Sequence, residues 1–145
     1  MARWKIRPAA TQDAVPLATC INAAYADYRE RIKDLPPVSV GIDHDIKSNL
    51  VWVAELDRSI VGGLILVLKD EYAMLANLAV DPDCKGMGIG RGLIGKAETE
   101  CRRLKKRELR LSTHVAMPEN VSLYEHLGWQ ETGRSGNKVH MTKVL

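Results

Sequence analysis

Cysteine is scarce in this sequence of 145 residues, which contains only three. Cys20, Cys84 and Cys101 are odd in number and lie far apart along the chain, a pattern that argues against a disulfide framework and against a zinc site. We therefore interpret all three as free thiols and expect the protein to hold no metal.

Long apolar segments are also missing. The longest apolar run, residues 59–68 (SIVGGLILVL), is only about half as long as a membrane-spanning helix needs to be. The first nine residues, MARWKIRPA, carry no apolar stretch of the kind that a signal peptide requires. These two absences predict a cytosolic protein that does not enter a membrane.

A strong excess of charge is absent as well, since the formal net charge is only +3. The basic residues are nevertheless concentrated in the stretch from Arg102 to Arg110, which has six of them within the ten residues CRRLKKRELR. Lysine and arginine favour the last turn of a helix, where they complement the negative end of its dipole. We therefore interpret the stretch as a solvated helix end and do not expect nucleic acid as a partner, with an anionic ligand group and RNA as the alternatives.

What the sequence contains is typical of a globular protein. Hydrophobic residues make up 46% and charged residues 27% of the chain, and phenylalanine is absent beside three tryptophans and four tyrosines. No repeat, low-complexity linker or change in composition divides the chain. Because 145 residues are enough to bury a sizeable core without disulfides, we expect one domain over residues 1–145.

Apolar periodicity predicts the order of helices and strands. Thr11 and Asp13 are competent N-caps for a first helix that ends near Arg31, and the prolines of DLPPVSVG stop it. The expected order is β-α-α-β-β-β-α-β-α-β-β, which is an α/β (α+β) fold with a mixed sheet and helices on its faces. The predicted elements are strands at 4–7, 50–56, 59–68, 73–80, 108–113, 129–134 and 138–145, and helices at 14–31, 43–48 and 120–127. A further helix of some four turns follows the glycines, with an apolar stripe that runs from Leu93 to Leu104.

A glycine-rich stretch, DCKGMGIGRGL, separates an apolar strand from an amphipathic helix. It places four glycines within seven residues, although each glycine weakens a helix by roughly 1 kcal/mol relative to alanine. A strand, a glycine turn and a helix N-terminus together aim several backbone N–H groups at one point, and glycine allows a ligand to touch them. The stretch therefore predicts a phosphate-binding turn.

Two well-known phosphate loops do not explain this turn. The nucleoside triphosphatase loop ends in Gly-Lys-Ser/Thr, which the sequence does not contain. The segment GRGLIG, residues 90–95, formally matches the dinucleotide pattern G-x-G-x-x-G, but LST stands where the acidic residue of that pattern is expected. We interpret this second match as accidental.

A third loop fits better. The segment KGMGIG, residues 85–90, resembles the acetyl-CoA loop of the GCN5-related N-acetyltransferases (the GNAT family), Q/R-x-x-G-x-G/A, with Lys85 where the family has Gln or Arg. The segment ENVSLYEHLGWQETGR resembles the closing motif of the same family. The resemblance implies the GNAT fold, a central mixed and mostly antiparallel sheet of about seven strands flanked by helices.

The resemblance also implies an activity and a set of site residues. It implies direct transfer of acetyl from acetyl-CoA, the co-substrate, to a primary amine of a small molecule or peptide. The Leu78 backbone N–H is expected to stabilise the oxyanion, and Tyr124 to act as general acid on the coenzyme A sulfur. The residues implied in acetyl-CoA binding are Leu78, Ala79, Val80, Lys85, Gly86, Met87, Gly88, Ile89, Gly90, Arg91, Asn120 and Tyr124.

The general base and the acceptor stay open at this stage. Glu71 and a water ordered by Asn77 are both candidates for removing the proton from the amine. Tyr25, Tyr28 and Arg31 form a polar and aromatic wall that suits a small amine or a peptide amine equally well. A non-catalytic acyl-CoA-binding regulatory module and an RNA-associated modifier are the alternative functions, and the sequence leaves open whether the protein forms a homodimer.

Overall fold

The computed structural model describes residues 3–33 and 40–145. The segment DLPPVS, in which the sequence predicts a break after the first helix, lies outside these residues. The helices are α1 (Ala14–Arg31), α2 (Ile42–Ser48), α3 (Ile89–Arg103) and α4 (Pro118–His126), with short 3-10 turns at Thr11–Asp13 and Pro82–Cys84. The strands are β1 (Trp4–Pro8), β2 (Leu50–Leu56), β3 (Ser59–Leu68), β4 (Tyr72–Val80), β5 (Glu108–His114), β6 (Gln130–Ser135) and β7 (Lys138–Val144). In the described residues, no helix combines the length and the apolar character that crossing a membrane requires.

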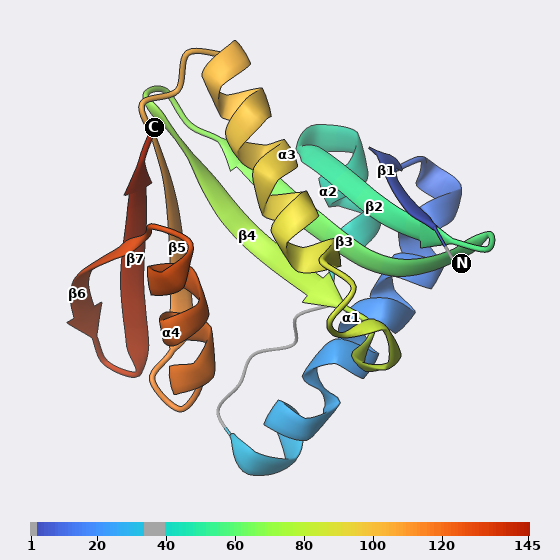
Figure 1. Ribbon diagram of the computed structural model, residues 1–145, viewed down its shortest axis with the longest axis horizontal. Helices are drawn as coiled ribbons and strands as arrows, with labels where there is room; N and C mark the ends of the chain where they lie inside the picture. Colours follow the sequence, from blue (N-terminus) through green and yellow to red (C-terminus); the bar gives the residue numbers. More distant parts are fainter. Residues whose placement is uncertain (1–2, 34–39) are drawn as a thin grey trace.

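All seven strands join one sheet in the order β1-β2-β3-β4-β5-β7-β6. Every neighbouring pair is antiparallel except β4 and β5, which are parallel and are connected through α3 (Figure 1). The predicted order of elements and the mixed, mostly antiparallel sheet are therefore confirmed. The element ends differ by a residue or two, most visibly in α4, which begins at Pro118 because proline suits the first position of a helix.

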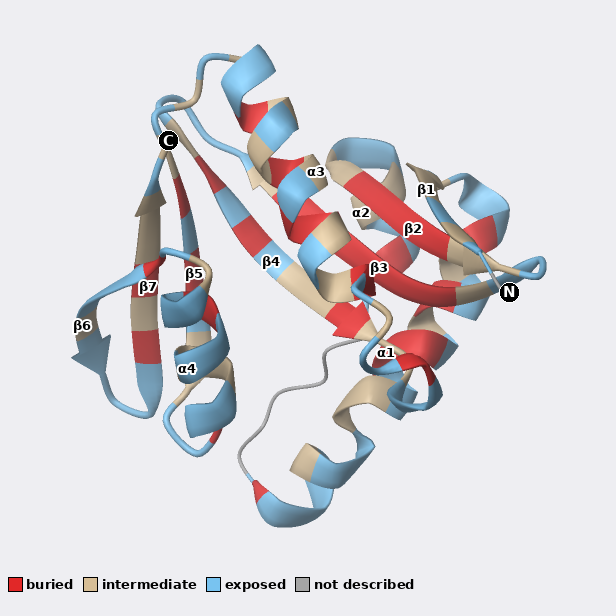
Figure 2. Cartoon of the chain, in the orientation of Figure 1, coloured by how far each residue is buried: buried red, intermediate tan, exposed pale blue. Residues whose placement is uncertain are grey.

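The two faces of the sheet are covered unequally. Helices α3 and α4 pack on one face, and α1 and α2 pack on the other, over β2, β3 and β4. Strand β3 is therefore buried almost continuously, whereas β5 alternates between buried and exposed positions (Figure 2). The half of the sheet formed by β5, β7 and β6 thus has one face without a helix over it.

Two adjacent glycines in β3 allow helices to pack closely on both faces. A Cβ at Gly62 would lie 2.9 Å from Ile89 of α3, and a Cβ at Gly63 would lie 2.3 Å from Leu17 of α1. Because neighbouring residues of a strand point to opposite faces, the pair Gly-Gly admits one helix on each side.

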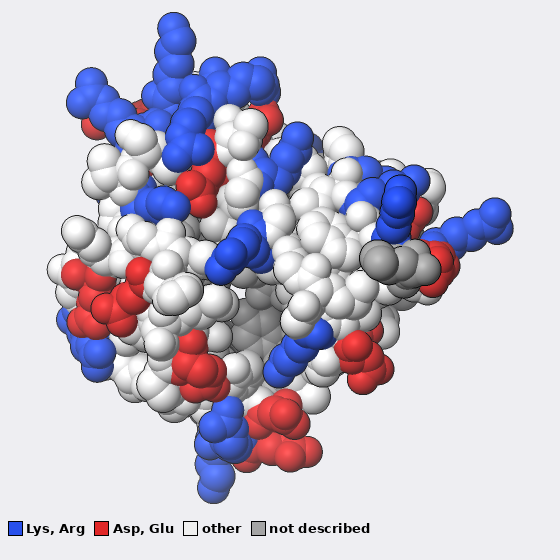
Figure 3. Space-filling view, viewed as in Figure 1, with Lys and Arg blue, Asp and Glu red and all other residues white. Residues whose placement is uncertain are grey.

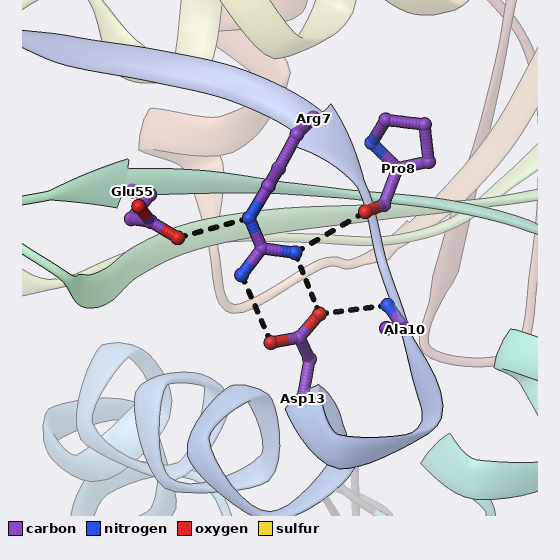
Figure 4. A network of polar contacts seen from close by, with 5 residues as sticks. All are labelled: Arg7, Pro8, Ala10, Asp13 and Glu55. Carbon is purple, nitrogen blue, oxygen red and sulfur yellow. Dashed lines mark hydrogen bonds and ion pairs between the residues drawn. The ribbon is translucent and has the colours of Figure 1, made fainter.

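A buried ion pair fixes the start of the chain to α1 (Figure 4). The Asp13 carboxylate accepts hydrogen bonds from Arg7 Nη1 at 2.7 Å, Arg7 Nη2 at 3.0 Å and the Ala10 N–H at 2.7 Å. Arg7 Nε also donates to Glu55 of β2 at 2.9 Å. This corrects the predicted caps, because the Asp13 side chain turns back to Arg7 instead of capping α1 and Thr11 lies within the preceding 3-10 turn. Hydrogen bonding to Arg7 lowers the pKa of Asp13.

Candidate functional site

Strands β4 and β5 separate after a short stretch of pairing. Only Tyr72, Ala73 and Met74 of β4 pair with β5, the last pair being Met74 with Arg110. Beyond that pair β4 continues to Val80 and β5 to His114, and the two strands diverge (Figure 1). The divergence opens a V-shaped gap in the sheet, bordered by the second half of β4.

A β-bulge decides which backbone groups of β4 face this gap. The register between β3 and β4 shifts so that Ala76 is the extra residue on β4. Past the bulge, the Asp81 N–H donates to the Val61 C=O of β3 at 2.8 Å. Since the hydrogen-bonding direction alternates along a strand, the N–H and C=O groups of Leu78 and Val80 point away from β3 and into the gap.

Two tyrosines reach the gap region from opposite faces of the sheet. The Tyr25 hydroxyl, on α1, lies 3.5 Å from the Leu78 C=O. Tyr124, on α4, is only 7% exposed, and its ring centre lies 5.4 Å from that of Trp129. Burial, with a smaller contribution from nearby Tyr25, raises the pKa of Tyr124. The phenol therefore stays protonated at neutral pH and can act as a proton donor.

The glycine turn lies directly after β4 and leads into α3. Gly86 and Gly88 have φ angles of 83° and 82°, in the left-handed region that other residues avoid. Gly88 is the N-cap of α3, and the first bond within the helix runs from the Gly92 N–H to the Gly88 C=O at 2.9 Å. The N–H groups of the helical residues before Gly92 are thus left without an acceptor in the helix, at the positive end of its dipole.

A pocket of about 230 Å³ joins the open end of β4 to this turn. It lies between the N-terminal end of α3 and α4, where the molecular surface is hollowed (Figure 3). Bare backbone amides beside two cationic side chains suit a phosphate or pyrophosphate group. Its lining contains eight of the predicted cofactor residues: Leu78, Val80, Lys85, Gly86, Gly88, Ile89, Gly90 and Arg91.

Four other predicted cofactor residues do not line this pocket, and one of them is Tyr124, which packs against Trp129. Ala79 is buried on the α1 side of β4, and the alternation that turns Leu78 to the gap turns the Ala79 backbone to β3. The Met87 C=O accepts a hydrogen bond from Trp4 Nε1 at 3.0 Å. Asn120 directs its amide to Thr113, 3.4 Å away, at the base of α4.

Trp4 and Glu119 were not predicted as site residues. Besides its bond to Met87, Trp4 covers Gly92, whose Cβ would lie 2.6 Å from the indole ring, so it fixes the position of the glycine turn. No local pattern identifies this role, because Trp4 and Met87 are 83 residues apart in the chain. Glu119 lies in the first turn of α4 and takes part in contacts with α1.

The predicted acceptor wall is brought together around Glu119. Arg31 lies 5.1 Å from the centre of the Tyr28 ring, and its Nη2 lies 3.4 Å from Glu119 Oε1. Burial, followed by the hydrogen bond to Glu119, raises the pKa of Tyr28 to about 12. Tyr25 packs beside Tyr28, with ring centres 6.0 Å apart. This cluster joins the end of α1 to the start of α4 near the gap.

The two residues considered for removing the proton from the amine, Asn77 and Glu71, lie in very different places. Asn77 follows the bulge on β4, and its Oδ1 atom is buried. Glu71 precedes β4 at the paired end, roughly 23 Å along the chain from Leu78 at about 3.3 Å per residue. A direct role for Glu71 in the gap is therefore ruled out by distance.

Two further features of the sequence, Cys84 and the basic stretch from Arg102 to Arg110, do not contribute a reactive or binding group to this site. Cys84 is 9% exposed, and burial raises the pKa of its thiol, so it is not an activated nucleophile. The basic stretch forms a blue group over the C-terminal end of α3, with Arg102 paired to Glu98 at 3.5 Å (Figure 3). Since α3 has 15 residues, this group lies roughly 22 Å from the glycine turn.

Comparison with known proteins adds independent information about the family. The protein-family model that describes the GNAT acetyltransferase domain matches residues 47–131, which is more than half of the chain. Human N-acetyltransferase 8B is 31% identical over 90 residues, which cover 58% of this chain but only 40% of the human protein.

Solved structures share the fold over the whole chain. PaiA N-acetyltransferase of Thermoplasma acidophilum, solved with coenzyme A, superposes with a TM-score of 0.86 at 21% identity and 99% coverage of both chains. A GNAT-family acetyltransferase of Staphylococcus aureus Mu50 superposes with a TM-score of 0.84 at 20% identity, also over 99% of both chains. At such identities the likeness shows a common fold.

Proposed function

Because this chain belongs to the GNAT acetyltransferase family, we propose that it transfers the acetyl group of acetyl-CoA directly to a primary amine. One observation carries the proposal: the open edge of β4 at Leu78 and Val80 leads straight into the glycine turn at the start of α3. An extended amide-containing arm and a pyrophosphate need these two features side by side. Acetyl-CoA contains both groups.

Different residues of the pocket bind different parts of acetyl-CoA. The N–H groups at the start of α3 hold the pyrophosphate, and Lys85 and Arg91 add positive charge beside it. The edge groups of Leu78 and Val80 hydrogen-bond the pantetheine arm as a neighbouring strand would. The Leu78 N–H then stabilises the oxyanion that forms when the amine attacks the thioester.

Tyr124 completes the transfer as a proton donor. Coenzyme A leaves as a thiolate unless a proton is supplied, and the buried phenol of Tyr124 carries one at neutral pH. Tyr25, whose hydroxyl donates to the Leu78 C=O at 3.5 Å, borders the side from which the amine approaches. The proposal involves no covalent acetyl-enzyme, in agreement with the inactive thiol of Cys84.

The acceptor is a small-molecule or peptide amine in this proposal. Tyr28, Arg31 and Glu119 offer an aromatic face, a cation and a carboxylate at the mouth of the gap, a combination that suits an amine with further polar groups. A cytosolic location and a single domain remain part of the proposal. A homodimer is neither required nor excluded by it.

An acetylation screen tests the proposal. Purified protein is incubated with acetyl-CoA and a panel of polyamines, amino-acid amides and short peptides with free N-termini, and the released coenzyme A is measured by free-thiol detection. We expect amine-dependent release for one class of the panel, confirmed by mass spectrometry of the acetylated product. Tight acetyl-CoA binding without release for any amine would favour the non-catalytic binding module.

A further inference from the structure

A second concavity lies on the face of the sheet opposite the glycine turn. It has a volume of about 530 Å³ and is formed by β5, β7 and β6 together with the start of β4, on the face that α1 and α2 leave uncovered. Its polar and ionisable lining residues are Tyr72, Glu108, Arg110, Ser112, Thr132, His140 and Thr142. None of these residues has been assigned a part in the transfer so far.

At one end of this concavity, a histidine is held between two serines. His140 Nδ1 lies 2.7 Å from Ser112 Oγ, and His140 Nε2 lies 2.7 Å from Ser135 Oγ. A neutral imidazole satisfies both contacts when Nε2 donates to Ser135 and Nδ1 accepts from Ser112. The reverse tautomer satisfies both contacts equally well, and the form with Nδ1 unprotonated can take up a proton from Ser112.

Ser112 is the member of this cluster that lies beside the gap. It follows Arg110, the last β5 residue paired with β4, by two positions, and its side chain is exposed. The bulge at Ala76 follows Met74, the partner of Arg110, by two positions as well. Ser112 is thus level with the bulge across the V-shaped gap.

We propose that Ser112 and His140 together take the proton from the acceptor's ammonium group. This inference rests on the proposed function, which so far names no group that removes the proton from the acceptor amine. The ammonium N–H bond breaks as the proton passes to Ser112 Oγ, while the Ser112 hydroxyl proton passes to His140 Nδ1. The products are a neutral amine and an imidazolium held by Ser112 and Ser135.

The remaining protons of the reaction balance. The freed lone pair of the amine forms the C–N bond, and the C–S bond breaks. The nitrogen then loses a second proton, which equals the one that coenzyme A takes up through Tyr124. His140 returns its proton to the solvent, so that one proton is released for each acetyl group transferred.

Two other ionisable groups on this face, Glu108 and Lys138, are less suited to the task. Glu108 is paired with Arg110, whose guanidinium also stacks 3.7 Å from the centre of the Tyr72 ring. These groups lie at the paired end of β4 and β5, and Glu108 is roughly 13 Å along β5 from Ser112. Lys138 shares the face of His140 on β7 but is a cation and accepts no proton when charged.

The test uses two amines that differ in their need for a base. The amine with the highest kcat/KM in the acetylation screen is compared with an analogue that carries fluorine on the second carbon from the nitrogen. The fluorine lowers the pKa of the ammonium group, so a much larger fraction of this amine is unprotonated at neutral pH. We measure kcat/KM for both amines with wild type, His140→Gln, Ser112→Ala and Ser112→Thr. His44→Gln, on exposed α2, is the matched control.

The expected result is selective. His140→Gln keeps hydrogen-bonding groups for the serines but accepts no proton, so kcat/KM for the ordinary amine falls about a hundredfold and for the fluorinated amine less than about threefold. Ser112→Ala behaves in the same way, and Ser112→Thr, which keeps the hydroxyl, restores most of the loss. His44→Gln changes neither value.

Three other outcomes overturn the inference for different reasons. Equal losses with both amines, or a lowered melting temperature that accounts for the loss, would assign His140 a merely structural role. If wild type acetylates no amine in the screen, the proposed function itself fails and the inference falls with it. Unchanged kcat/KM with the ordinary amine in His140→Gln excludes the relay while leaving acetyl transfer intact.

Discussion

The two ends of β4 are similar in sequence but differ in what lies along their edges. At Tyr72–Met74 the strand pairs with β3 on one side and β5 on the other, whereas at Leu78–Val80 only β3 is paired. Both segments are apolar, YAM and LAV. The closed end is therefore paired on both sides, whereas the Leu78 and Val80 backbone groups of the open end have no strand partner on the side of the gap.

The bulge at Ala76 is what separates the two ends. Without the extra residue, the hydrogen-bonding direction at the open end would be reversed, and Ala79 in place of Leu78 would face the gap. The variants below act either on the binding pocket and its chemistry or on a structural contact far from it, so each tests whether binding and stability depend on separate regions of the molecule.

The largest effect is expected at the glycine turn. Gly88→Val forces a branched side chain into a left-handed backbone conformation and tilts the amides that follow. Because two charge-assisted hydrogen bonds to the pyrophosphate are then lost, acetyl-CoA affinity should fall several hundredfold, about 3–4 kcal/mol. Calorimetry on the folded variant measures this. Gly95→Ala, within α3 and with open space around it, is the control and should leave the affinity unchanged. A Gly88 variant with wild-type affinity would remove the turn from the binding site.

Tyr124→Phe should affect chemistry and leave binding intact. The ring and most of its packing against Trp129 remain, but the proton donor is lost, so kcat should fall about tenfold to a thousandfold with little change in acetyl-CoA affinity or melting temperature. The measurement is made in single turnover, because slow product release would hide the effect. An unaltered single-turnover rate would contradict the role of Tyr124 as acid.

Asp13→Asn acts far from the open edge and should affect stability alone. Loss of the ion pair with Arg7 should lower the free energy of unfolding by about 2 kcal/mol at neutral pH, with acetyl-CoA affinity unchanged. The folded-state pKa of Asp13 is lowered from 3.8, so its stabilisation is present above that pH and is lost as the pH falls through the lower folded value. Melting curves of wild type and variant should therefore converge below pH 3.8. A constant difference at all pH values would show that packing, not charge, is lost.

The smallest effect is expected for Lys85→Ala. Lysine is a point charge without the planar hydrogen bonding of glutamine or arginine, and Lys85 is exposed at the rim of the pocket. The KM for acetyl-CoA should rise by about threefold to tenfold, and the rise should be larger at low salt than at high salt, because salt screens the wild-type contact. A rise of more than about thirtyfold, roughly 2 kcal/mol, would show that the side chain contributes more than its charge.

The sequence by itself determined the order of elements and the position of the turn. Apolar periodicity and the prolines and glycines between segments act over a few residues, so the helices and strands formed close to where the pattern indicates. The left-handed glycines at 86 and 88 likewise follow from local backbone sterics. For the same reason eight of the residues predicted to bind the cofactor, which lie within one strand, one turn and one helix start, line one pocket.

Only the tertiary structure decided which of these groups face one another. The register of β4 against β3 turned Leu78 toward the gap and Ala79 away from it. Trp4 came to hold a turn 83 residues away, and Ser112 met His140 across 28 residues of chain because β7 pairs with β5. Such contacts depend on strand order, divergence and helix packing summed over the whole chain, and no short stretch of sequence contains that information.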